Sequence, residues 1–456
     1  MSPSLASDRQ RVYLDDLKTL LSIPSVSTDP ARKGEVRRCA DEVARQMREA
    51  GLKDVAIMET EGHPSVFGQY LVDPALPTVL VYGHYDVQPE DPVELWTSPP
   101  FEPTERDGKL YARGATDDKG QFLCHIKAVA NLLKDTGTLP LNVKVIIEGE
   151  EEIGSPHLAP LLKANKELLA ADVLVVSDSA MFAPGQPSIV YGLRGLSFIQ
   201  IDLKGADSDL HSGVFGGAVP NPAMELARIL AQLKDSDERV TVPGFYDAVL
   251  DLTPEERDAY AALPFDNEEF RAGLNVAGLA GETGYSVLEQ RTARPTLEIN
   301  GMLSGYTGVG AKTVLPSRAM AKISCRLVPD QDPKEIAALL EKHVRSLCSP
   351  NVECQVTVKH GGHPWLTPPD HPALEAAAVA VRAVFGKEPV RVREGGSIPI
   401  VIDFQNILGL PGILLGFGLN DENLHAPDEH FRIENFYKGI ELSAALLKAL
   451  GAAKVP

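Results

Sequence analysis

The sequence predicts an α/β protein whose first domain has a mixed, mostly parallel sheet with helices on both faces. An inserted α+β, ferredoxin-like domain completes the expected fold. Continuous apolar runs alternate with helical patterns up to about Gly192, which is typical of a covered parallel sheet. Beyond that point, strands with alternating apolar and polar residues appear. Because 456 residues exceed the usual size of one core, we expect domains at 1–192 with 365–456, and at 193–364.

Each element of the first domain has its own signal. Apolar residues at helical spacing predict helices, and short β-branched runs predict strands. In chain order these ranges are helices Arg11–Leu21 and Val36–Ala50, strand Thr78–Tyr82, helix Lys119–Leu133, and strands Asn142–Ile147 and Asp172–Val176. The pattern returns after Pro364, with helices Ala373–Phe385 and Glu434–Leu450 around a strand at Gly412–Phe417. In sheets of this kind, ligands collect at the carboxyl ends of the strands.

The second domain reads as strand, helix, strand, helix, strand, an order that resembles a ferredoxin-like unit. The ranges are Leu196–Leu203, Asn221–Leu233, Ala319–Leu327, Pro333–Leu347 and Val352–Val358. The stretch from Lys234 to Pro295 is an additional insertion, which we expect to be helical.

Composition excludes several classes of protein. The net charge is −19 and no Lys/Arg-rich run stands out, which argues against a nucleic-acid partner. The beginning of the sequence lacks a signal-peptide pattern, and the longest apolar runs are too short to span a membrane. The five cysteines show no CxxC spacing, and their odd number argues against a disulfide framework. We therefore expect a cytoplasmic protein.

Five acidic and histidine-bearing patches carry the chemistry, and most of them follow an apolar run. They read HYDVQP (84–89), RGATDDKGQ (113–121), EGEEEIGS (148–155), VVSDS (175–179) and NLHAPDEH (423–430). Carboxylates and imidazoles at strand ends cost desolvation energy unless a positive charge joins them. A pair of divalent metal ions would supply that charge.

Each patch alone has an ordinary structural explanation. His84 and Asp86, two residues apart on an extended backbone, could be a hydrogen-bonded core pair. Asp117 could cap a helix, and so could Asp178. The run of glutamates from 150 to 152 could be a solvated turn, and His425 could be a surface histidine. The set as a whole is far more specific than any member.

Taken together, the patches resemble the dinuclear-zinc family of carnosinase, cytosolic nonspecific dipeptidase, carboxypeptidase G, aminoacylase and the deacylases of acetylornithine and succinyl-diaminopimelate. The likeness runs from about residue 10 to 450 and is nearest to the dipeptidase branch. It rests on the ordered motifs HYDVQP, RGATDDKG, EEIGS, SDS, DLHSGVFGG, AKTVLP, CRLVP, REGGSIP and LHAPDE.

The resemblance implies a role for each residue of the first domain. His84 and Asp178 would bind one zinc ion, Glu152 and His425 the other, and Asp117 would bridge both. Asp86 would lie behind His84, and Glu151 would be the general base. Glu150 is an additional acid in this run, and the motif EEIGS sets the register that excludes it.

The resemblance also implies roles for the second domain and the segment after it. His211 would stabilise the oxyanion, often in the partner subunit, although it could be a polar turn residue. Arg326 would bind the substrate carboxylate, although an exposed strand-end arginine needs no function. The turn Gly395, Gly396 and Ser397 could hold an anion through its N–H groups. Thr313 is a further candidate substrate contact.

The function implied is hydrolysis of the peptide bond of dipeptides or short peptides. A hydroxide held between two metal ions would attack the carbonyl while Glu151 moves the proton. Zinc fits mixed histidine and carboxylate ligands, and manganese or cobalt would also fit. We expect the second domain to act as a lid and to form a homodimer contact. Alternatives are an N-acyl amino acid amidohydrolase, a carboxypeptidase, or a non-catalytic peptide-binding protein.

Overall fold

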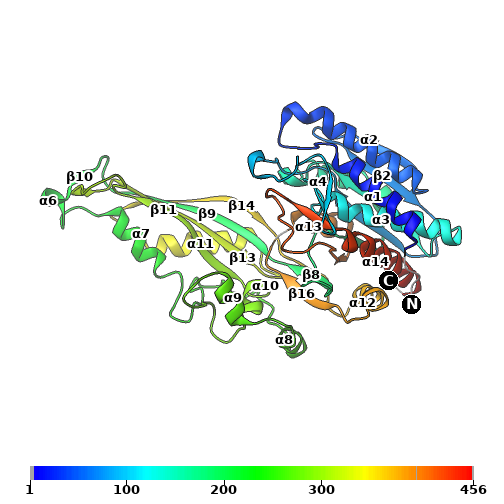
Figure 1. Ribbon diagram of the computed structural model, residues 1–456. Coiled ribbons are helices and arrows are strands. Elements are labelled where there is room, and N and C mark those ends of the chain that lie inside the picture. The colour runs from blue at the N-terminus through cyan, green and yellow to red at the C-terminus, as the bar shows by residue number, and fades with distance from the viewer. Residues whose placement is uncertain (1–4, 397, 454–456) are drawn as a thin grey trace. The chain divides into compact units, whose positions relative to one another are not determined.

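The computed structural model describes residues 5–396 and 398–453, in which the chain forms two compact units (Figure 1). The first unit comprises Met1–Tyr191, Thr367–Val392 and Ile400–Pro456, and the second comprises Gly192–Leu366 and Arg393–Pro399. The sequence analysis placed 393–399 in the first domain, whereas this short segment groups with the second unit. Among the described residues, every helix is too short or too polar to cross a bilayer.

The first unit is built on a mixed sheet in the order β1-β2-β6-β3-β7-β17-β8. The strands are β1 (Lys53–Met58), β2 (Ser65–Tyr70), β3 (Thr78–His84), β6 (Asn142–Glu148), β7 (Val173–Val176), β8 (Ser188–Leu193) and β17 (Gly412–Leu414). The four central strands, β6, β3, β7 and β17, are parallel. Strands β6 and β7 are buried along their whole length and β3 nearly so, which is why their sequences are almost uninterrupted apolar runs.

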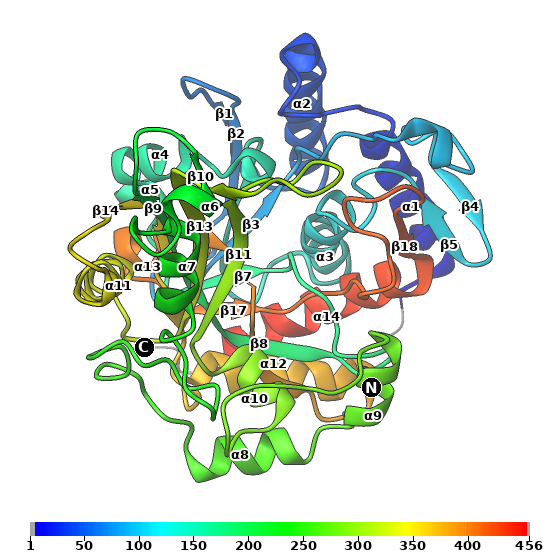
Figure 2. The same ribbon diagram turned by 90° about the vertical axis from the view of Figure 1, so that its left-hand side faces the viewer.

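Helices cover both faces of this sheet (Figure 2). Those of the first unit are α1 (Ser7–Leu21), α2 (Lys33–Glu49), α3 (Lys119–Thr136), α4 (Leu158–Ala164), α5 (Lys166–Leu169), α12 (Pro372–Phe385), α13 (Pro399–Leu408) and α14 (Ile433–Ala452). Helix α3 packs on β3 and on α14, while α4 and α13 lie on the opposite side of the sheet. Gly137 ends α3 with φ of 74°, a conformation that favours glycine. The predicted fold class is confirmed.

Short pieces of structure surround the main sheet of the first unit. A small sheet has the order β18-β5-β4, with β4 at Thr104–Arg106, β5 at Lys109–Tyr111 and β18 at His430–Arg432. Strand β18 therefore brings the chain after His425 beside the chain before Asp117. Short 3-10 turns occupy Pro30–Arg32, Val93–Leu95 and Glu151–Ile153.

The second unit contains a four-stranded antiparallel sheet in the order β11-β13-β9-β14. Its strands are β9 (Gly195–Lys204), β11 (Thr296–Ser304), β13 (Arg318–Leu327) and β14 (Glu353–Gly362). Helices α7 (Pro222–Leu230) and α11 (Pro333–Leu347) pack against the sheet on the same side (Figure 1). Alternate residues of β9 are buried, including Ile199 and Ile201, which join the core beneath α7 and α11.

The sequence analysis missed one strand, β11, of this four-stranded sheet. With β11 included, the order becomes strand, helix, strand, strand, helix, strand, which is the complete ferredoxin-like arrangement. The predicted insertion contains helices α8 (Pro254–Ala261), α9 (Asn267–Gly273) and α10 (Val287–Thr292). The remaining pieces of the unit are β10 (Leu210–His211), α6 (Ser212–Phe215), β12 (Val314–Leu315) and β15 (Trp365–Leu366), together with the end of β16 (Val390–Glu394).

Candidate metal centre

The polar patches of the first unit meet at the carboxyl edge of its parallel strands. His84 is the last residue of β3, and Asp178 lies two residues beyond the end of β7. Glu151 and Glu152 form the short turn that follows β6. Because β6, β3 and β7 are neighbours in that order, these side chains start from adjacent strand ends. The fold thus brings together residues that are far apart in the sequence.

Asp117, just before α3, lies between two histidines. One carboxylate oxygen, Oδ1, is 3.1 Å from Nε2 of His84, and the other, Oδ2, is 2.8 Å from Nε2 of His425. His84 is fully buried, whereas the side chain of His425 is 54% exposed. The peptide bond between Asp117 and Asp118 is cis. Each oxygen of one carboxylate therefore faces a different imidazole.

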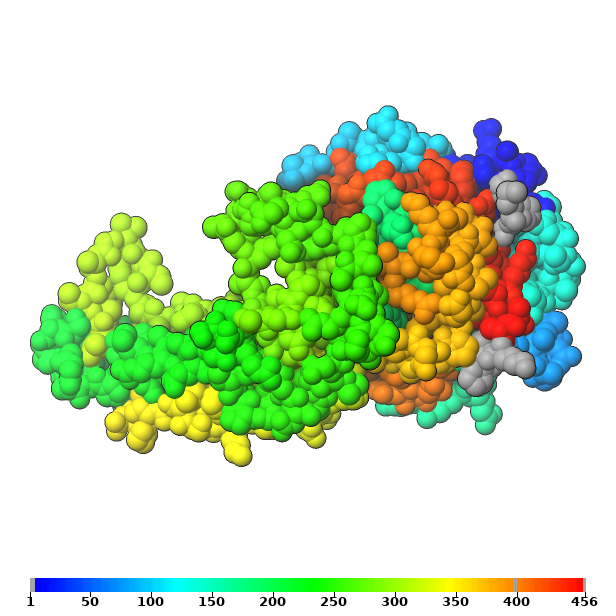
Figure 3. Space-filling view, turned by 90° about the horizontal axis from the view of Figure 1, so that it is seen from below, coloured from blue at the N-terminus to red at the C-terminus, as the bar shows by residue number. Residues whose placement is uncertain are grey.

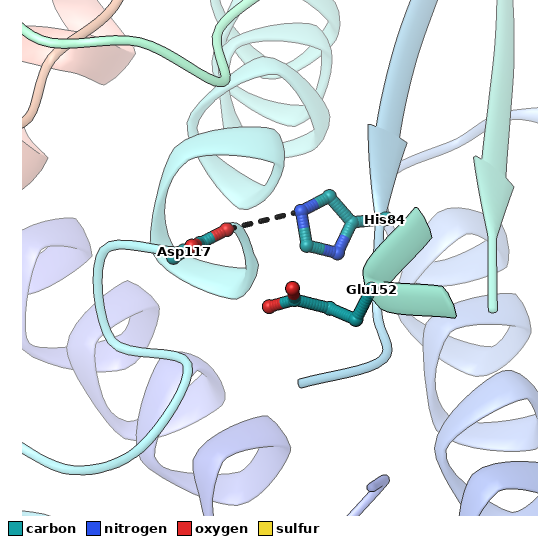
Figure 4. Close-up of side chains that lie close together, drawn as sticks. All are labelled: His84, Asp117 and Glu152. Carbon is teal, nitrogen blue, oxygen red and sulfur yellow. Dashed lines mark hydrogen bonds and ion pairs between the residues drawn. The ribbon is translucent and has the colours of Figure 1, made fainter. Parts of the chain in front are cut away.

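Two further carboxylates lie beside these imidazoles. Glu152 Oε2 is 3.5 Å from Nε2 of His425, and Asp178 Oδ2 is 3.9 Å from Nε2 of His84. His84, Asp117 and Glu152 each offer a ligand atom, and these three atoms lie within 4.8 Å of one another (Figure 4). Glu152 therefore lies near both imidazoles, whereas Asp178 lies near His84.

Asp86 connects the end of β3 to the glutamate turn. Its Oδ1 lies 3.4 Å from Nδ1 of His84, and the backbone carbonyl of Asp86 lies 3.0 Å from the same nitrogen. The two carboxylate oxygens of Asp86 accept hydrogen bonds from the amides of Glu151 and Glu152, each at 3.1 Å. One buried carboxylate therefore fixes the histidine ring and the turn that bears both glutamates.

Glu150 points to different partners from its two neighbours. Its carboxylate pairs with Nδ1 of His157 at 2.7 Å and accepts the amide N–H of His63 at 3.0 Å. A Cβ added to Gly62 would lie 1.9 Å from this carboxylate, so the glycine leaves room for it. Glu150 is thus engaged in holding a loop, which separates its role from those of Glu151 and Glu152.

The sequence analysis assigned no role to Glu429, which holds the loop before α3 in place. This fully buried side chain accepts the amides of Gly114, Thr116 and Asp117 at 3.1 to 3.2 Å. The guanidinium of Arg113 donates to the same carboxylate at 2.6 Å. Glu429 thus ties the loop of Asp117 to the loop of His425. Its only sequence signal was its place at the end of LHAPDE.

The loop around His425 has an unusual backbone. Asn423, His425 and Asp428 all have positive φ, between 56° and 59°. Such residues tolerate this conformation better than most, yet each still costs about 1–3 kcal/mol. The carboxylate of Asp428 accepts the amide and hydroxyl of Thr97, which anchors the loop. Strain of this kind is typical of loops that aim a functional side chain.

The carboxylates of this cluster outnumber the positively charged groups beside them. Burial raises the pKa of Glu152 to about 7, and Asp117 adds to this increase. The same two causes raise the pKa of Asp178 to about 6. A hydrogen bond to Asp117 raises the pKa of His425 to about 9. Burial also raises the pKa of Glu151 well above its usual value. A divalent cation would remove this repulsion.

The predicted functional residues of the second unit lie on the β10–β12 ribbon and around a cavity near the end of β13. His211 and Thr313 are exposed on the β10–β12 ribbon, where Nδ1 of His211 accepts the amide of Gly213 at 3.0 Å. Arg326, near the end of β13, lines a separate cavity of about 430 Å³. Gly395 lies beside Arg194, whose Nε donates to the Gly395 carbonyl at 3.2 Å. Gly396 is exposed, and Ser397 lies outside the described residues.

The donor set fits a metal ion. Imidazole and carboxylate groups gathered around one aspartate suit a metal ion such as zinc or manganese, and the buried Asp86 contacts His84 from behind. At the carboxyl edge of an α/β sheet, with the Glu151 carboxyl close by, this arrangement is typical of a metallohydrolase.

Comparison with known proteins places the chain more narrowly. It belongs to the peptidase family M20/M25/M40, whose family description matches residues 80–449. It is 34% identical to the Cys-Gly metallodipeptidase dug1 of Schizosaccharomyces pombe, over 96% of each chain. It is 37% identical to the human Beta-Ala-His dipeptidase, over 84% of this chain and 76% of the relative.

A solved structure agrees with these relatives. The M20 family metallo-carboxypeptidase from Sulfolobus solfataricus has a TM-score of 0.82 and 33% identity, over 96% of this chain and 99% of that one. The family predicted from the motifs is therefore confirmed, with dipeptidases among the relatives. The chain is a peptidase of this family.

Proposed function

We propose that this protein is a metal-dependent dipeptidase that hydrolyses the peptide bond of dipeptides or very short peptides. The observation that carries the proposal is the position of Asp117 between His84 and His425, with Glu152 and Asp178 beside them. Relatives named as Cys-Gly and Beta-Ala-His dipeptidases support the choice of substrate.

Two metal ions suit this set of two imidazoles and three carboxylates. We assign His84 and Asp178 to one ion and His425 and Glu152 to the other, with Asp117 shared. Bound there, such ions would activate a water molecule and polarise the scissile carbonyl. Zinc is our first choice, because its proteins favour mixed histidine and carboxylate ligands, and manganese or cobalt would fit the same set.

Glu151 acts as the general base in this proposal. Its carboxyl is largely buried at the same strand edge and is not needed as a donor to either ion. It accepts the proton of the attacking water and delivers it to the leaving amine. Asp86 keeps the carboxyl in place, because it binds the Glu151 amide and the ring of His84 together. The turn therefore presents base and ligand as one rigid unit.

Residues of the second unit recognise the ends of the substrate. Arg326 pairs with the terminal carboxylate, which a guanidinium binds through two parallel hydrogen bonds. The backbone N–H groups of Gly395 and Gly396, here called the Gly395 turn, add to this contact, and Thr313 is a further contact. His211 donates to the oxyanion that forms at the scissile carbonyl.

We propose that the working form is a homodimer, with His211 serving the site of the partner subunit. The exposed position of His211 on its short ribbon suits such a role. Exposed apolar side chains on the edge strand β11, such as Met302 and Leu303, offer a surface for the partner. We also propose a cytoplasmic location, because all five cysteines are free thiols.

A carboxypeptidase is the second candidate, because a solved relative of 33% identity carries that name. It would use the same metal centre and the same carboxylate contact but would accept a longer chain on the amine side. Rates on Ala-Ala, on a longer alanine peptide and on acetyl-Ala separate the two candidates from an N-acyl amino acid amidohydrolase. A dipeptidase prefers Ala-Ala over both of the others.

The proposal is tested by metal removal. Dialysis against a chelator should abolish hydrolysis of Ala-Ala, and readdition of zinc, manganese or cobalt should restore it. Metal analysis of the purified protein identifies the ions that it holds. Turnover that persists after complete removal of metal contradicts the proposal.

A further inference from the structure

The proposed function leaves the insertion at residues 234–295 without a role, although it forms much of the surface seen in Figure 3. Helices α8 and α10 within it pack together. Arg257 pairs with Glu289 at 2.9 Å, Tyr260 hydrogen-bonds Thr292 at 2.8 Å, and a small apolar core lies between them. This part of the insertion is therefore an organised support.

Helix α8 contacts Arg393, which lies just before the Gly395 turn. The guanidinium of Arg393 forms an ion pair with Glu256, and the two side chains are 5% and 9% exposed. The backbone N–H of Arg393 also donates to the Tyr260 hydroxyl at 3.2 Å. Breaking a buried ion pair is costly, so this contact anchors the end of β16 firmly.

Arg194 joins the same turn to the end of α10. Its Nε donates to the carbonyl of Gly395 at 3.2 Å. Its Nη1 lies 3.4 Å from the Gln290 carbonyl and 3.3 Å from the Arg294 carbonyl. One guanidinium thus bridges the turn and the insertion, which a lysine could do only in part.

Gly395 is pressed against this support. A Cβ at this position would lie 2.3 Å from the carbonyl oxygen of Arg291 and 2.7 Å from Nη2 of Arg194. The first atom belongs to the backbone of α10, so it cannot move aside without shifting the helix. Gly395 is therefore required for the close approach of the turn to the insertion.

The same guanidinium lines the cavity that contains Arg326. This cavity, about 430 Å³ in volume, is also lined by Arg291 and by residues of the insertion. Burial lowers the pKa of Arg194 to about 10, and the nearby Arg326 and Arg291 add to the decrease. Four arginines and Lys234 line this cavity against three glutamates, so positive charge is in excess and the guanidinium groups suit a planar anion such as a carboxylate.

We propose that Arg194 is a positioning residue for recognition of the substrate's terminal carboxylate, and that the insertion serves to hold it and the Gly395 turn in place. The inference rests on the proposed function, in which Arg326 and the Gly395 turn bind that carboxylate. Arg194 acts through the turn, whose Gly395 carbonyl it binds, and it lines the same cavity as Arg326.

The test compares Arg194→Ala and Arg194→Lys with Arg271→Ala. Arg271 is a matched control, because it lies in the same insertion but bonds Glu268 and the Val276 carbonyl. All enzymes are metal-loaded and assayed on Ala-Ala and on its C-terminal amide. Arg194→Ala should raise KM for Ala-Ala by about 10-fold or more, with little change in kcat. Arg194→Lys should lie between it and wild type.

The amide substrate distinguishes positioning from general damage. Without a carboxylate to recognise, it should lose far less from Arg194→Ala than Ala-Ala does. Equal losses on both substrates, or an unchanged KM, overturn the proposal. Gly395→Ala is a second route to the same result, because its Cβ would displace the turn from Arg194 and α10 although the chain keeps every arginine.

A structural readout makes the two proposals separable. Hydrogen exchange of the backbone at 390–396 should be about 10-fold faster in Arg194→Ala than in wild type or Arg271→Ala. If the wild-type enzyme failed to hydrolyse dipeptides, the proposed function would fall, yet this exchange would still report whether Arg194 holds the turn. Unchanged exchange in Arg194→Ala contradicts the inference regardless of activity.

Discussion

The strand-end cluster of the first unit and the β10–β12 ribbon of the second unit carry predicted functional residues in very different settings. In the cluster, the side chains lie at the ends of buried parallel strands or in the loops that Glu429 connects. Most of them contact several neighbours. On the ribbon, His211 and Thr313 are exposed. The side chains of the cluster are held in position by contacts within the first unit. The exposed side chains of the ribbon are free to contact a substrate or a partner subunit.

The largest effect expected in the cluster is at Glu151, the proposed general base. Glu151→Gln should lower kcat by roughly 100- to 10,000-fold, since the variant cannot accept a proton, while its metal content stays at the wild-type level. Glu150→Gln is the matched control, because that carboxylate holds His157 and the His63 amide. The control should lose stability and keep most of its turnover. The reverse ranking would show that the base has been assigned to the wrong glutamate.

The ribbon is tested at His211. His211→Ala should lower kcat by about 100-fold through loss of an oxyanion donor, with metal content unaffected. If the histidine serves the partner subunit, mixing inactive His211→Ala and Glu151→Gln proteins should recover activity, because a hybrid dimer has one complete site. The measurement is turnover after confirmed subunit exchange. Lack of recovery would place His211 in its own subunit's site or outside the chemistry.

The rigidity of the cluster is tested at Asp86. Asp86→Asn keeps the shape of the side chain but removes the charge behind His84, so metal affinity should fall about 10- to 100-fold. Competition with a chromogenic chelator measures this directly. Asp15→Asn, on the exposed face of α1, is the control and should bind metal like wild type. Undiminished affinity in Asp86→Asn would mean that the backbone alone orients the ligands.

The last test concerns stability rather than turnover. Burial raises the pKa of Glu148 to about 7, although hydrogen bonds from Tyr82 and Ser155 act in the opposite direction. The folded state therefore keeps a proton that the unfolded chain releases above about pH 4.3. Glu148 thus destabilises the protein progressively as pH rises to 7, by up to about 3 kcal/mol.

Glu148→Gln should flatten this dependence. Urea unfolding of the metal-loaded variant between pH 5 and about 7.5 should show a smaller loss of stability than wild type. Substitution of Glu59, which is exposed beside Arg37, should leave the wild-type slope unchanged. An identical slope in wild type and Glu148→Gln would refute the assignment.

Much of this molecule could be predicted from its sequence, because buried parallel strands and motifs placed at their ends leave a strong pattern. The fold class and the family are confirmed, and strand β3 begins where its β-branched run begins. The roles of individual site residues stay predictions, although the cluster around Asp117 lies together as they require.

Each element that the sequence analysis missed has a physical reason. Strand β11 lies at the edge of its sheet and is mostly exposed, so Glu298, Ile299 and Gly301 show no clean alternation. Helix α13 is a short apolar run, which periodicity cannot distinguish from a buried strand. The supporting residues Arg194 and Glu429 act through backbone carbonyls and amides, and such contacts leave no signature in a single sequence.

The bond between Asp117 and His425 joins residues 308 positions apart, and Glu429 locks their two loops together. A ribosome emits the first of these residues long before the second. With the ligands assigned as proposed above, the nascent chain would lack a complete metal site throughout most of its synthesis. On that proposal, hydrolysis could begin only after the segment that contains His425 had been translated and folded.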